Sequence, residues 1–427
     1  MTSCLSRELT LPCGAVVRNR LVKAAMTEGL ATMSGVPTPA LDRLYGLWSD
    51  GGAGALLTGN IQVDHKHLER PGNVIIEGTP NTELTDSLAR WAQAGTRGGN
   101  HLWAQISHAG RQTQKNVNPH PGAPSAIPLS IPGGNFGRPV ELSITEIEDI
   151  IGRFGIAAQA CKQAGFTGVQ VHGAHGYLLS EFLSPRANHR GDHYGGDLAG
   201  RARALLEVVR TIRDQVGPEF PIAVKLNSAD FQKGGFDFAD SLQVAQWLEQ
   251  AGVDLIEVSG GTYEQPKLVG IKGMEQEEAQ NVKHSTRLRE AYFADFAAAM
   301  QKQVSIPLMA TGGFRQRAVM EYAIESGSAD LIGLGRPMCI DVDAPARLLS
   351  GLDELNRYED RLTLLPGWLS FLEKSGMVRA LSGFSVMYWY YSQLELLGQT
   401  GAPQPGMSVW SAALRVTKQQ ARLLRDR

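Results

Sequence analysis

The chain has 427 residues, and its 41 lysines and arginines nearly balance its 43 aspartates and glutamates. This balance argues against a polycationic surface for nucleic acid or an anionic membrane, and no run of about 18 apolar residues predicts a transmembrane helix. The four cysteines form no CxxC pair, which argues against a disulfide scaffold, a zinc site and an iron–sulfur cluster. The first residues have no apolar core of a signal peptide, so we expect a cytoplasmic protein.

The apolar pattern is typical of an α/β protein. Residues 9–17 alternate around a turn with proline and glycine, which predicts a small N-terminal hairpin that plugs the bottom of a barrel. Eight apolar runs follow, each ending in glycine, serine, asparagine or histidine and each followed by a helical pattern. They cover residues 20–25, 55–63, 101–108, 168–175, 221–228, 255–261, 306–313 and 331–337. Eight such units predict a (β/α)8 TIM barrel whose active site lies at the carboxyl ends of the strands.

The helix before the fourth run has clear boundaries. Ser143 and Glu146 predict a capping box at its start, and Gly165 predicts its end. Cys161 lies on the apolar stripe of this helix, so we expect a buried thiol rather than a reactive one.

Two connections and the C-terminal region depart from the βα rhythm. The connections at residues 109–142 and 262–285 are long enough to form lids or substrate walls. We divide the chain into a catalytic barrel, residues 1–345, and a C-terminal helical extension, residues 346–427. The aromatic run at residues 387–391 is expected to pack on the barrel or on a partner subunit rather than to contact substrate, and it would suit a homodimer.

The fourth apolar run ends in His172, His175 and Tyr177. The spacing of the histidines is compatible with a metal site, to which His189, His193, Asp192 and Asp197 would be the nearest further ligands, although no HExxH motif is present. Two imidazole N–H groups can also hold one carbonyl oxygen, and Tyr177 can deliver a proton to the same substrate. A third alternative is that the histidines are packed in the core, and spacing alone does not decide among the three.

Other runs also end in polar groups. Gly312, Gly313, Gly335 and Arg336 follow the last two runs, where barrels of this type commonly bind phosphate. Lys225 lies between apolar neighbours and needs a negative partner, since burial of an unpaired ammonium is costly; it would either form a Schiff base or face an anionic ring. Gln105 and Thr27 would add neutral hydrogen bonds.

Taken together, these residues resemble the old yellow enzyme family of NADH:flavin oxidoreductases. The likeness is carried by residues 172–185, with His172, His175, Tyr177, Glu181, Ser184 and Pro185, and by Asn188, Arg190, Asp192 and residues 194–196 after them. It extends from residue 19 to residue 337 and therefore covers the barrel.

The resemblance implies noncovalent FMN, reduced by NADPH or NADH, with its phosphate on Gly313, Gly335 and Arg336. Ala24, Ala25, Met26 and Thr27 would line the isoalloxazine, Gly59 and Gln105 would touch its pyrimidine side, and Lys225 would lie near the atoms that gain negative charge on reduction. It further implies that an α,β-unsaturated carbonyl compound binds with its oxygen between His172 and His175. The flavin would then pass a hydride to the β-carbon, and Tyr177 would protonate the α-carbon.

The sequence departs from the family at several positions. Many members have arginine in place of Lys225 and proline in place of Ala25, and one branch has cysteine in place of Thr27. The cysteine cluster of the larger iron–sulfur members is absent, since only Cys339 follows the last strand. Three alternatives stay open: an oxidative or isomerising flavoenzyme, an FMN-binding interaction module, and a metal-dependent or Schiff-base barrel lyase or hydrolase. The physiological substrate and the choice between NADH and NADPH also stay open.

Overall fold

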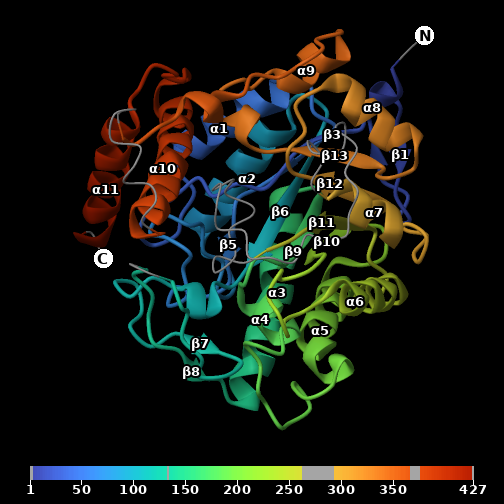
Figure 1. Ribbon diagram of the computed structural model, residues 1–427, viewed down its shortest axis with the longest axis vertical. Coiled ribbons are helices and arrows are strands. Elements are labelled where there is room, and N and C mark those ends of the chain that lie inside the picture. Colours follow the sequence, from blue (N-terminus) through green and yellow to red (C-terminus); the bar gives the residue numbers. More distant parts are fainter. Residues whose placement is uncertain (1–2, 132–133, 262–292, 366–375, 426–427) are drawn as a thin grey trace.

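The computed structural model describes residues 3–131, 134–261, 293–365 and 376–425. Parallel strands form the centre of the molecule and helices surround them (Figure 1). The long connection expected at residues 262–285 lies outside the described residues.

Eight parallel strands close into a barrel, because β13 pairs with β3 and β4 pairs with β6. These strands are β3 (Leu21–Lys23), β4 (Ala55–Leu57), β6 (His101–Ser107), β9 (Gly168–Gly173), β10 (Ile222–Asn227), β11 (Leu255–Ser259), β12 (Leu308–Thr311) and β13 (Leu331–Leu334). A short strand, β5 (Ile61–Gln62), also pairs with β6. Each of the eight predicted runs contains one barrel strand, so the predicted (β/α)8 fold is confirmed.

Helices follow the strands and bury them on the outside, which is why the barrel strands are apolar along most of their length. The helices are α1 (Pro39–Asp50), α2 (Thr82–Thr96), α3 (Ile144–Ala164), α4 (Leu178–Leu183), α5 (Leu198–Val216), α6 (Phe238–Gln250), α7 (Ala294–Met300), α8 (Arg317–Glu325), α9 (Ala344–Leu349), α10 (Gly376–Thr400) and α11 (Val409–Arg425). Short 3-10 helices are η1 (Cys4–Ser6), η2 (Gly110–Gln112), η4 (Arg336–Cys339) and η5 (Tyr358–Arg361).

The N-terminal hairpin is present as predicted. Strands β1 (Leu9–Thr10) and β2 (Val16–Val17) pair antiparallel, and Leu11 and Val17 pack in one cluster with barrel residues that include Val22 and Trp103. His101, the first residue of β6, contacts the carbonyl oxygen of Val16 through Nε2 at 3.0 Å. The hairpin therefore covers the end of the barrel at which the strands begin, and leaves the opposite end to the loops.

Helix α3 has the expected ends. Its capping box forms between Ser143 and Glu146, and Gly165 adopts a left-handed conformation with φ of 97° at the C-terminal end. Cys161 is fully buried, and burial raises the pKa of its thiol, so it is the inert, buried residue that the apolar stripe predicted.

The C-terminal region contributes a pair of contacting helices, α10 and α11, which lie side by side at the edge of the barrel (Figure 1). Trp389 of α10 donates from Nε1 to the carbonyl oxygen of Met407 at 2.8 Å, which ties the helix to the segment that leads into α11. Arg43 of α1 donates to the carbonyl oxygen of Gly398 at 2.7 Å. The extension thus packs on the barrel through α1.

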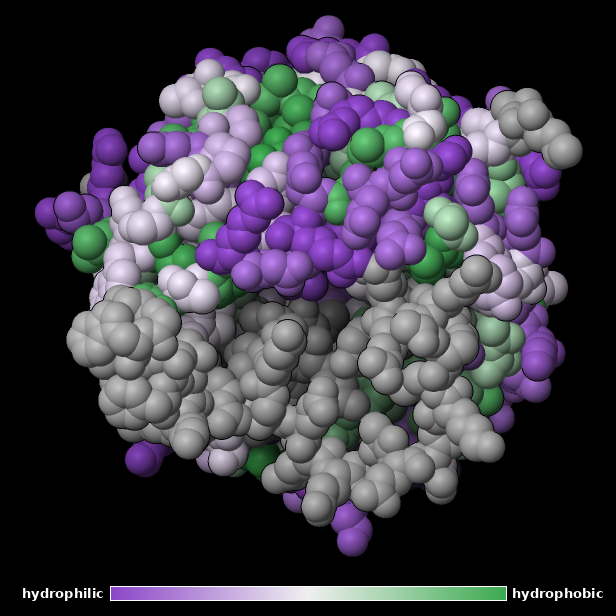
Figure 2. All heavy atoms as spheres, turned by 45° about the horizontal axis from the view of Figure 1, so that its top comes forward, coloured by the Kyte–Doolittle hydropathy of each residue, from purple (hydrophilic) through white to green (hydrophobic). Residues whose placement is uncertain are grey.

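Two short strands, β7 (Gly122–Ala123) and β8 (Val140–Glu141), pair in the long connection after β6. On the face shown in Figure 2, hydrophilic residues form a broad band across the described surface, with apolar residues scattered among them. None of the described helices is both long and apolar enough to cross a membrane.

Candidate active site

The carboxyl ends of the strands surround a cavity of about 270 Å³. Most of the candidate residues lie together in its wall. They are Ala25, Met26, Thr27, Gln105, His172, His175, Tyr177, Lys225 and Arg336. Because these residues come from strands far apart in the sequence, their meeting in one cavity is a consequence of barrel closure.

Sequence reasoning missed part of this wall. The structure adds Asn60 and Cys339, and one side of helix α10 supplies Val386, Met387, Tyr390, Tyr391 and Leu394. The sequence predicts that the segment around residues 387–391 packs on the barrel or on a partner subunit, and α10 does pack on the barrel through α1. The same helix also lines the cavity, which the sequence did not indicate. The available signal was the apolar pattern of this helix, which does not show which surface it meets.

His172 and His175 face one another at the end of β9. His172 Nε2 lies 3.2 Å from His175 Nδ1, and the two rings are nearly perpendicular. The outer nitrogen of His172, Nδ1, contacts Asn60 Oδ1 at 3.1 Å and Ser107 Oγ at 3.3 Å. Burial, reinforced by the positive charge of Lys225, holds the pKa of both histidines well below its usual value. Both rings are therefore neutral at physiological pH, and each carries one ring proton.

The backbone of His175 is held in an uncommon conformation, with φ of 64°. Its N–H donates to Asn227 Oδ1 at 3.1 Å, and its carbonyl oxygen accepts from Gln112 Nε2 at 3.0 Å. A left-handed conformation of a residue other than glycine persists where the surroundings over-determine it, and such residues cluster at functional sites. The strands and η2 thus fix the direction of the His175 imidazole.

Tyr177 occupies the residue before α4 and is almost fully buried. Its ring centroid lies 4.7 Å from that of His172. The three predicted catalytic side chains are therefore adjacent in the structure.

Lys225 has the negative partner that its burial required. Its Nζ lies 2.7 Å from Oε1 of Glu257, a residue that is fully buried on β11. The other carboxylate oxygen accepts from Gln170 Nε2 at 2.7 Å, and Gln170 Oε1 accepts from Gln105 Nε2 at 2.7 Å. This chain of hydrogen bonds crosses four neighbouring strands. A paired ammonium lacks the lone pair that a Schiff base needs, so the arrangement favours an electrostatic role for Lys225.

The proposed phosphate end shows features that suit an anion. Gly312 and Gly313, which follow β12, have φ of 131° and 79°, conformations that favour glycine, and neither has a side chain to cover its backbone. Arg336, at the start of η4, lines the cavity and keeps partial exposure, with Glu359 3.9 Å away. Glu359 makes a closer pair with Arg315, at 2.6 Å. Among the described residues, the carboxylate that pairs with the Arg336 guanidinium is that of Glu359 at 3.9 Å, and a guanidinium at the cavity wall suits a phosphate.

Two of the residues implied for the flavin have other contacts. Ala24 is buried, and its N–H donates to the carbonyl oxygen of Leu334 within the barrel sheet. Gly59 donates its N–H to Oε1 of Glu28 at 2.9 Å, and the same oxygen accepts from the hydroxyl of Tyr45. The cavity wall does not include Ala24, Gly59, Gly312, Gly313 or Gly335.

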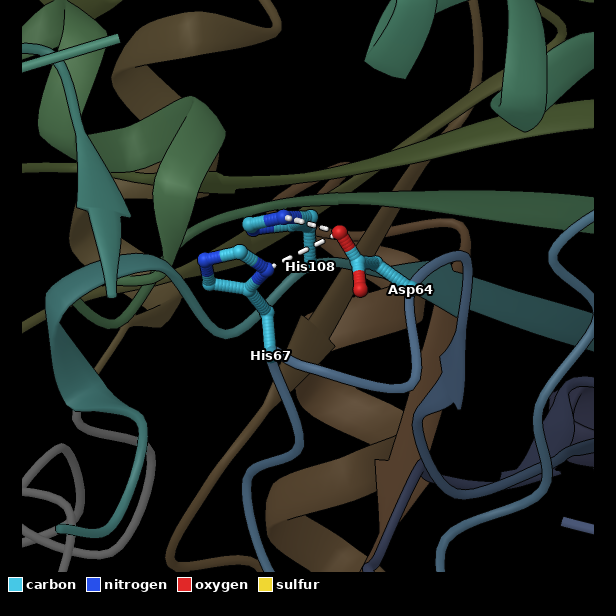
Figure 3. Close-up of side chains that lie close together, drawn as sticks. All are labelled: Asp64, His67 and His108. Atoms are coloured by element: carbon cyan, nitrogen blue, oxygen red, sulfur yellow. Dashed lines mark hydrogen bonds and ion pairs between the residues drawn. The ribbon is translucent and has the colours of Figure 1, made fainter. Parts of the chain in front are cut away.

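A second group of titratable residues lies outside this cavity. Asp64, His67 and His108 are buried close together at the ends of β5 and β6, in an arrangement that resembles a metal site (Figure 3). His67 Nδ1 lies 2.9 Å from Asp64 Oδ2, and His108 Nε2 lies 3.9 Å from the same oxygen.

The hydrogen bonds at the far sides of the two rings argue against a metal. His67 Nε2 accepts from the N–H of Gly122 at 2.7 Å, and His108 Nδ1 accepts from the N–H of Gly110 at 3.1 Å. In a neutral imidazole the proton must then lie on the nitrogen that faces Asp64, where a metal would need a lone pair. In these tautomers both histidines turn an N–H group toward the Asp64 carboxylate, with His67 in hydrogen-bond contact and His108 3.9 Å away. Burial acts to raise the pKa of Asp64, but the two histidines outweigh it and hold that pKa below its usual value.

Comparisons with known proteins show which sequences and structures this chain resembles. A family model described as the NADH:flavin oxidoreductase / NADH oxidase family matches residues 13–354. The NADH-dependent flavin oxidoreductase iliE of Hypocrea jecorina (strain QM6a) is 35% identical over 361 residues, which cover 81% of this chain and 88% of that protein. The NADH-dependent flavin oxidoreductase iccE of Talaromyces variabilis is 32% identical over 423 residues, 93% of this chain and 99% of that protein. The solved old yellow enzyme homologue from Zymomonas mobilis has a TM-score of 0.67 and 25% identity, and the match covers 85% of this chain and 97% of that one.

Proposed function

The chain belongs to the NADH:flavin oxidoreductase / NADH oxidase family, which includes the old yellow enzymes, and we propose that it uses its FMN and NADH or NADPH to reduce the activated carbon–carbon double bond of α,β-unsaturated carbonyl compounds. The observation that carries the proposal is the pair of neutral histidines, His172 and His175, with converging ring nitrogens 3.2 Å apart in the cavity wall. Two such nitrogens suit one carbonyl oxygen.

The residues around the cavity fit FMN. The Lys225 ammonium, paired with Glu257, supplies a fixed positive charge that favours the anionic reduced ring, and Arg336 with the turn at Gly312 and Gly313 suits the phosphate. Met26 and Thr27 lie in the same wall. The chemistry that bound FMN supplies is two-electron transfer between NAD(P)H and the substrate.

The protein side chains would then act on the substrate. N–H groups of His172 and His175 hold the carbonyl oxygen and draw electron density from the double bond, which makes the β-carbon electrophilic. The β-carbon receives a hydride, and Tyr177 delivers a proton to the α-carbon. One hydride and one proton are added, so the products are a saturated carbonyl compound and NAD(P)⁺.

Helix α10 supports a substrate with an apolar body. Its contribution to the wall is Val386, Met387, Tyr390, Tyr391 and Leu394, which are aliphatic or aromatic. Apolar surface at this position keeps water from the reacting carbons and attracts the hydrocarbon part of an enone.

An anaerobic visible spectrum of the purified protein tests the proposal directly. We expect a yellow protein that bleaches with NADH or NADPH and regains its colour when 2-cyclohexenone is added. A flavin that bleaches but is not reoxidised by any simple enone would refute the substrate class. A protein that stays colourless after incubation with FMN would instead favour the alternative of a metal-dependent or Schiff-base enzyme.

The proton donor is tested by Tyr177→Phe. Loss of the hydroxyl should slow net reduction by about 10²-fold or more, the usual contribution of a positioned acid, while reduction of the flavin by NAD(P)H persists. Tyr194→Phe is the matched control, because Tyr194 is a buried tyrosine that is bonded to Glu207 and lies outside the cavity wall. An unchanged rate in Tyr177→Phe would remove Tyr177 from the mechanism.

A further inference from the structure

Four side chains form a continuous line of hydrogen bonds through the two histidines. Ser259 Oγ lies 2.7 Å from His175 Nε2, His175 Nδ1 lies 3.2 Å from His172 Nε2, and His172 Nδ1 lies 3.1 Å from Asn60 Oδ1. Ser259 is the last residue of β11, and Asn60 follows β4. The line therefore connects opposite sides of the barrel mouth through the substrate site.

Each ring in this line carries one proton, so the donors can be ordered. Asn60 Oδ1 can only accept, which places the proton of His172 on Nδ1 and leaves its Nε2 as an acceptor. His175 must then donate from Nδ1, and its Nε2 accepts from the hydroxyl of Ser259. Every donor meets an acceptor in this order. The opposite order would require the Asn60 amide to be rotated, although its Nδ2 now lies 3.5 Å from Thr27 Oγ1.

We propose that Ser259 is a positioning residue that stabilises, from its end of the line, the His175 tautomer with its proton on Nδ1, the nitrogen that faces His172. The inference rests on the proposed function only for the identity of the oxygen that this N–H meets. The Asn60 amide orders the protons from one end of the line, and the Ser259 hydroxyl supports the same order from the other end by donating to His175 Nε2. Ser259 thereby makes His175 a ready donor before substrate arrives.

The two histidines are consequently not equivalent. His175 keeps one tautomer with and without substrate. His172 must move its proton from Nδ1 to Nε2 to donate to the same oxygen, and the hydroxyl of Ser107, 3.3 Å from Nδ1, can then donate to the nitrogen that has lost its proton. His172 Nδ1 has two neighbours, the Asn60 oxygen as an acceptor and the Ser107 hydroxyl as a donor. His175 Nε2 has the Ser259 hydroxyl as its side-chain neighbour.

The tautomer is measured in the FMN-loaded protein without substrate, by long-range proton–nitrogen NMR of chains labelled at the histidine ring nitrogens. The His175 signals are assigned by their loss in His175→Gln. We expect protonated Nδ1 in the wild type and in Ser259→Thr, which retains the hydroxyl, and a shift toward protonated Nε2 in Ser259→Ala. Protonated Nε2 in the wild type, or an unchanged tautomer in Ser259→Ala, would overturn the inference.

Kinetics supply the second readout. Ser259→Ala should lower kcat/KM for 2-cyclohexenone by about 10-fold, less than the roughly 10² to 10³-fold loss expected when an oxyanion donor is removed outright, and Ser259→Thr should restore most of it. Ser228→Ala is the control, since Ser228 directly follows the neighbouring strand β10 and its buried Oγ has no hydrogen-bond partner among the described residues. Equal losses in the alanine and threonine variants would reduce Ser259 to a packing residue. If no enone is reduced at all, the proposed function fails, and the NMR result still decides the role of Ser259.

Discussion

The buried Lys23 tests whether burial lowers the pKa of a lysine in the barrel. Its side chain is fully buried between the barrel and α1, where Nζ donates to the carbonyl oxygen of Leu57 at 2.6 Å and lies 4.2 Å from the ring centroid of Trp48. Burial, partly offset by the charge of Glu28, lowers the pKa of Lys23 from 10.5 to about 8. The folded protein therefore loses this proton well before the unfolded chain does.

The sign of the effect on stability follows from that order. Between pH 8 and pH 10.5 the unfolded chain still binds the proton that the folded chain has released, so folding becomes more favourable as the pH rises. The distance between the two pKa values corresponds to about 3 kcal/mol in the free energy of unfolding. Lys23→Met removes the titrating group but keeps an unbranched side chain. The stability of the wild type relative to Lys23→Met should thus rise by about 3 kcal/mol between pH 7.5 and pH 10.5.

Urea unfolding of the FMN-loaded proteins at several pH values measures this difference. Groups that titrate in both proteins cancel when one free energy is subtracted from the other, which isolates Lys23. Lys302→Met, at an exposed position, is the control and should run parallel to the wild type. Parallel curves for the wild type and Lys23→Met would show that Lys23 is not held at a lowered pKa, and the account of its burial would be wrong.

Three further predictions concern the site and its surroundings. Lys225→Met leaves Glu257 buried without its partner, so the free energy of unfolding measured in denaturant titrations should fall by about 3 to 5 kcal/mol, and FMN binding should weaken. The double variant Lys225→Met, Glu257→Gln should recover part of the lost stability. Because the histidines present N–H groups to Asp64, zinc and EDTA should each leave the melting temperature unchanged, and stabilisation by zinc that is lost in Asp64→Asn would contradict this. Leu394→Ala should raise KM for a bulky enone more than for 2-cyclohexenone, by about 3-fold or more, and equal effects on both would remove α10 from substrate binding.

Local patterns were enough to predict the barrel. A strand that is buried on both faces must be a short apolar run, and a chain that packs helices outside such strands must alternate the two patterns, so eight runs predicted eight strands. Helix α3 was equally readable, because the Ser143 capping box and Gly165 act within a few residues of the helix ends. His172, His175 and Tyr177 could be found because one strand end carries all three.

Contacts between distant segments could not be predicted in the same way. Lys225 clearly needed a negative partner, but the choice of Glu257 depends on the register in which β10 and β11 pair, which places the two residues side by side. The cluster of Asp64, His67 and His108 likewise joins two segments that only the barrel brings together.

The sequence by itself therefore determined the strand and helix pattern, the end of the barrel that bears the candidate site and the side chains at the end of β9, because each of these depends on neighbours along the chain. Only the tertiary structure decided the partners across strands, the line of contacts from Ser259 to Asn60 and the place of α10 in the cavity wall. The physical reason is that hydrogen bonds and ion pairs form between groups about 3 Å apart in space, whatever the number of residues that separates these groups along the chain.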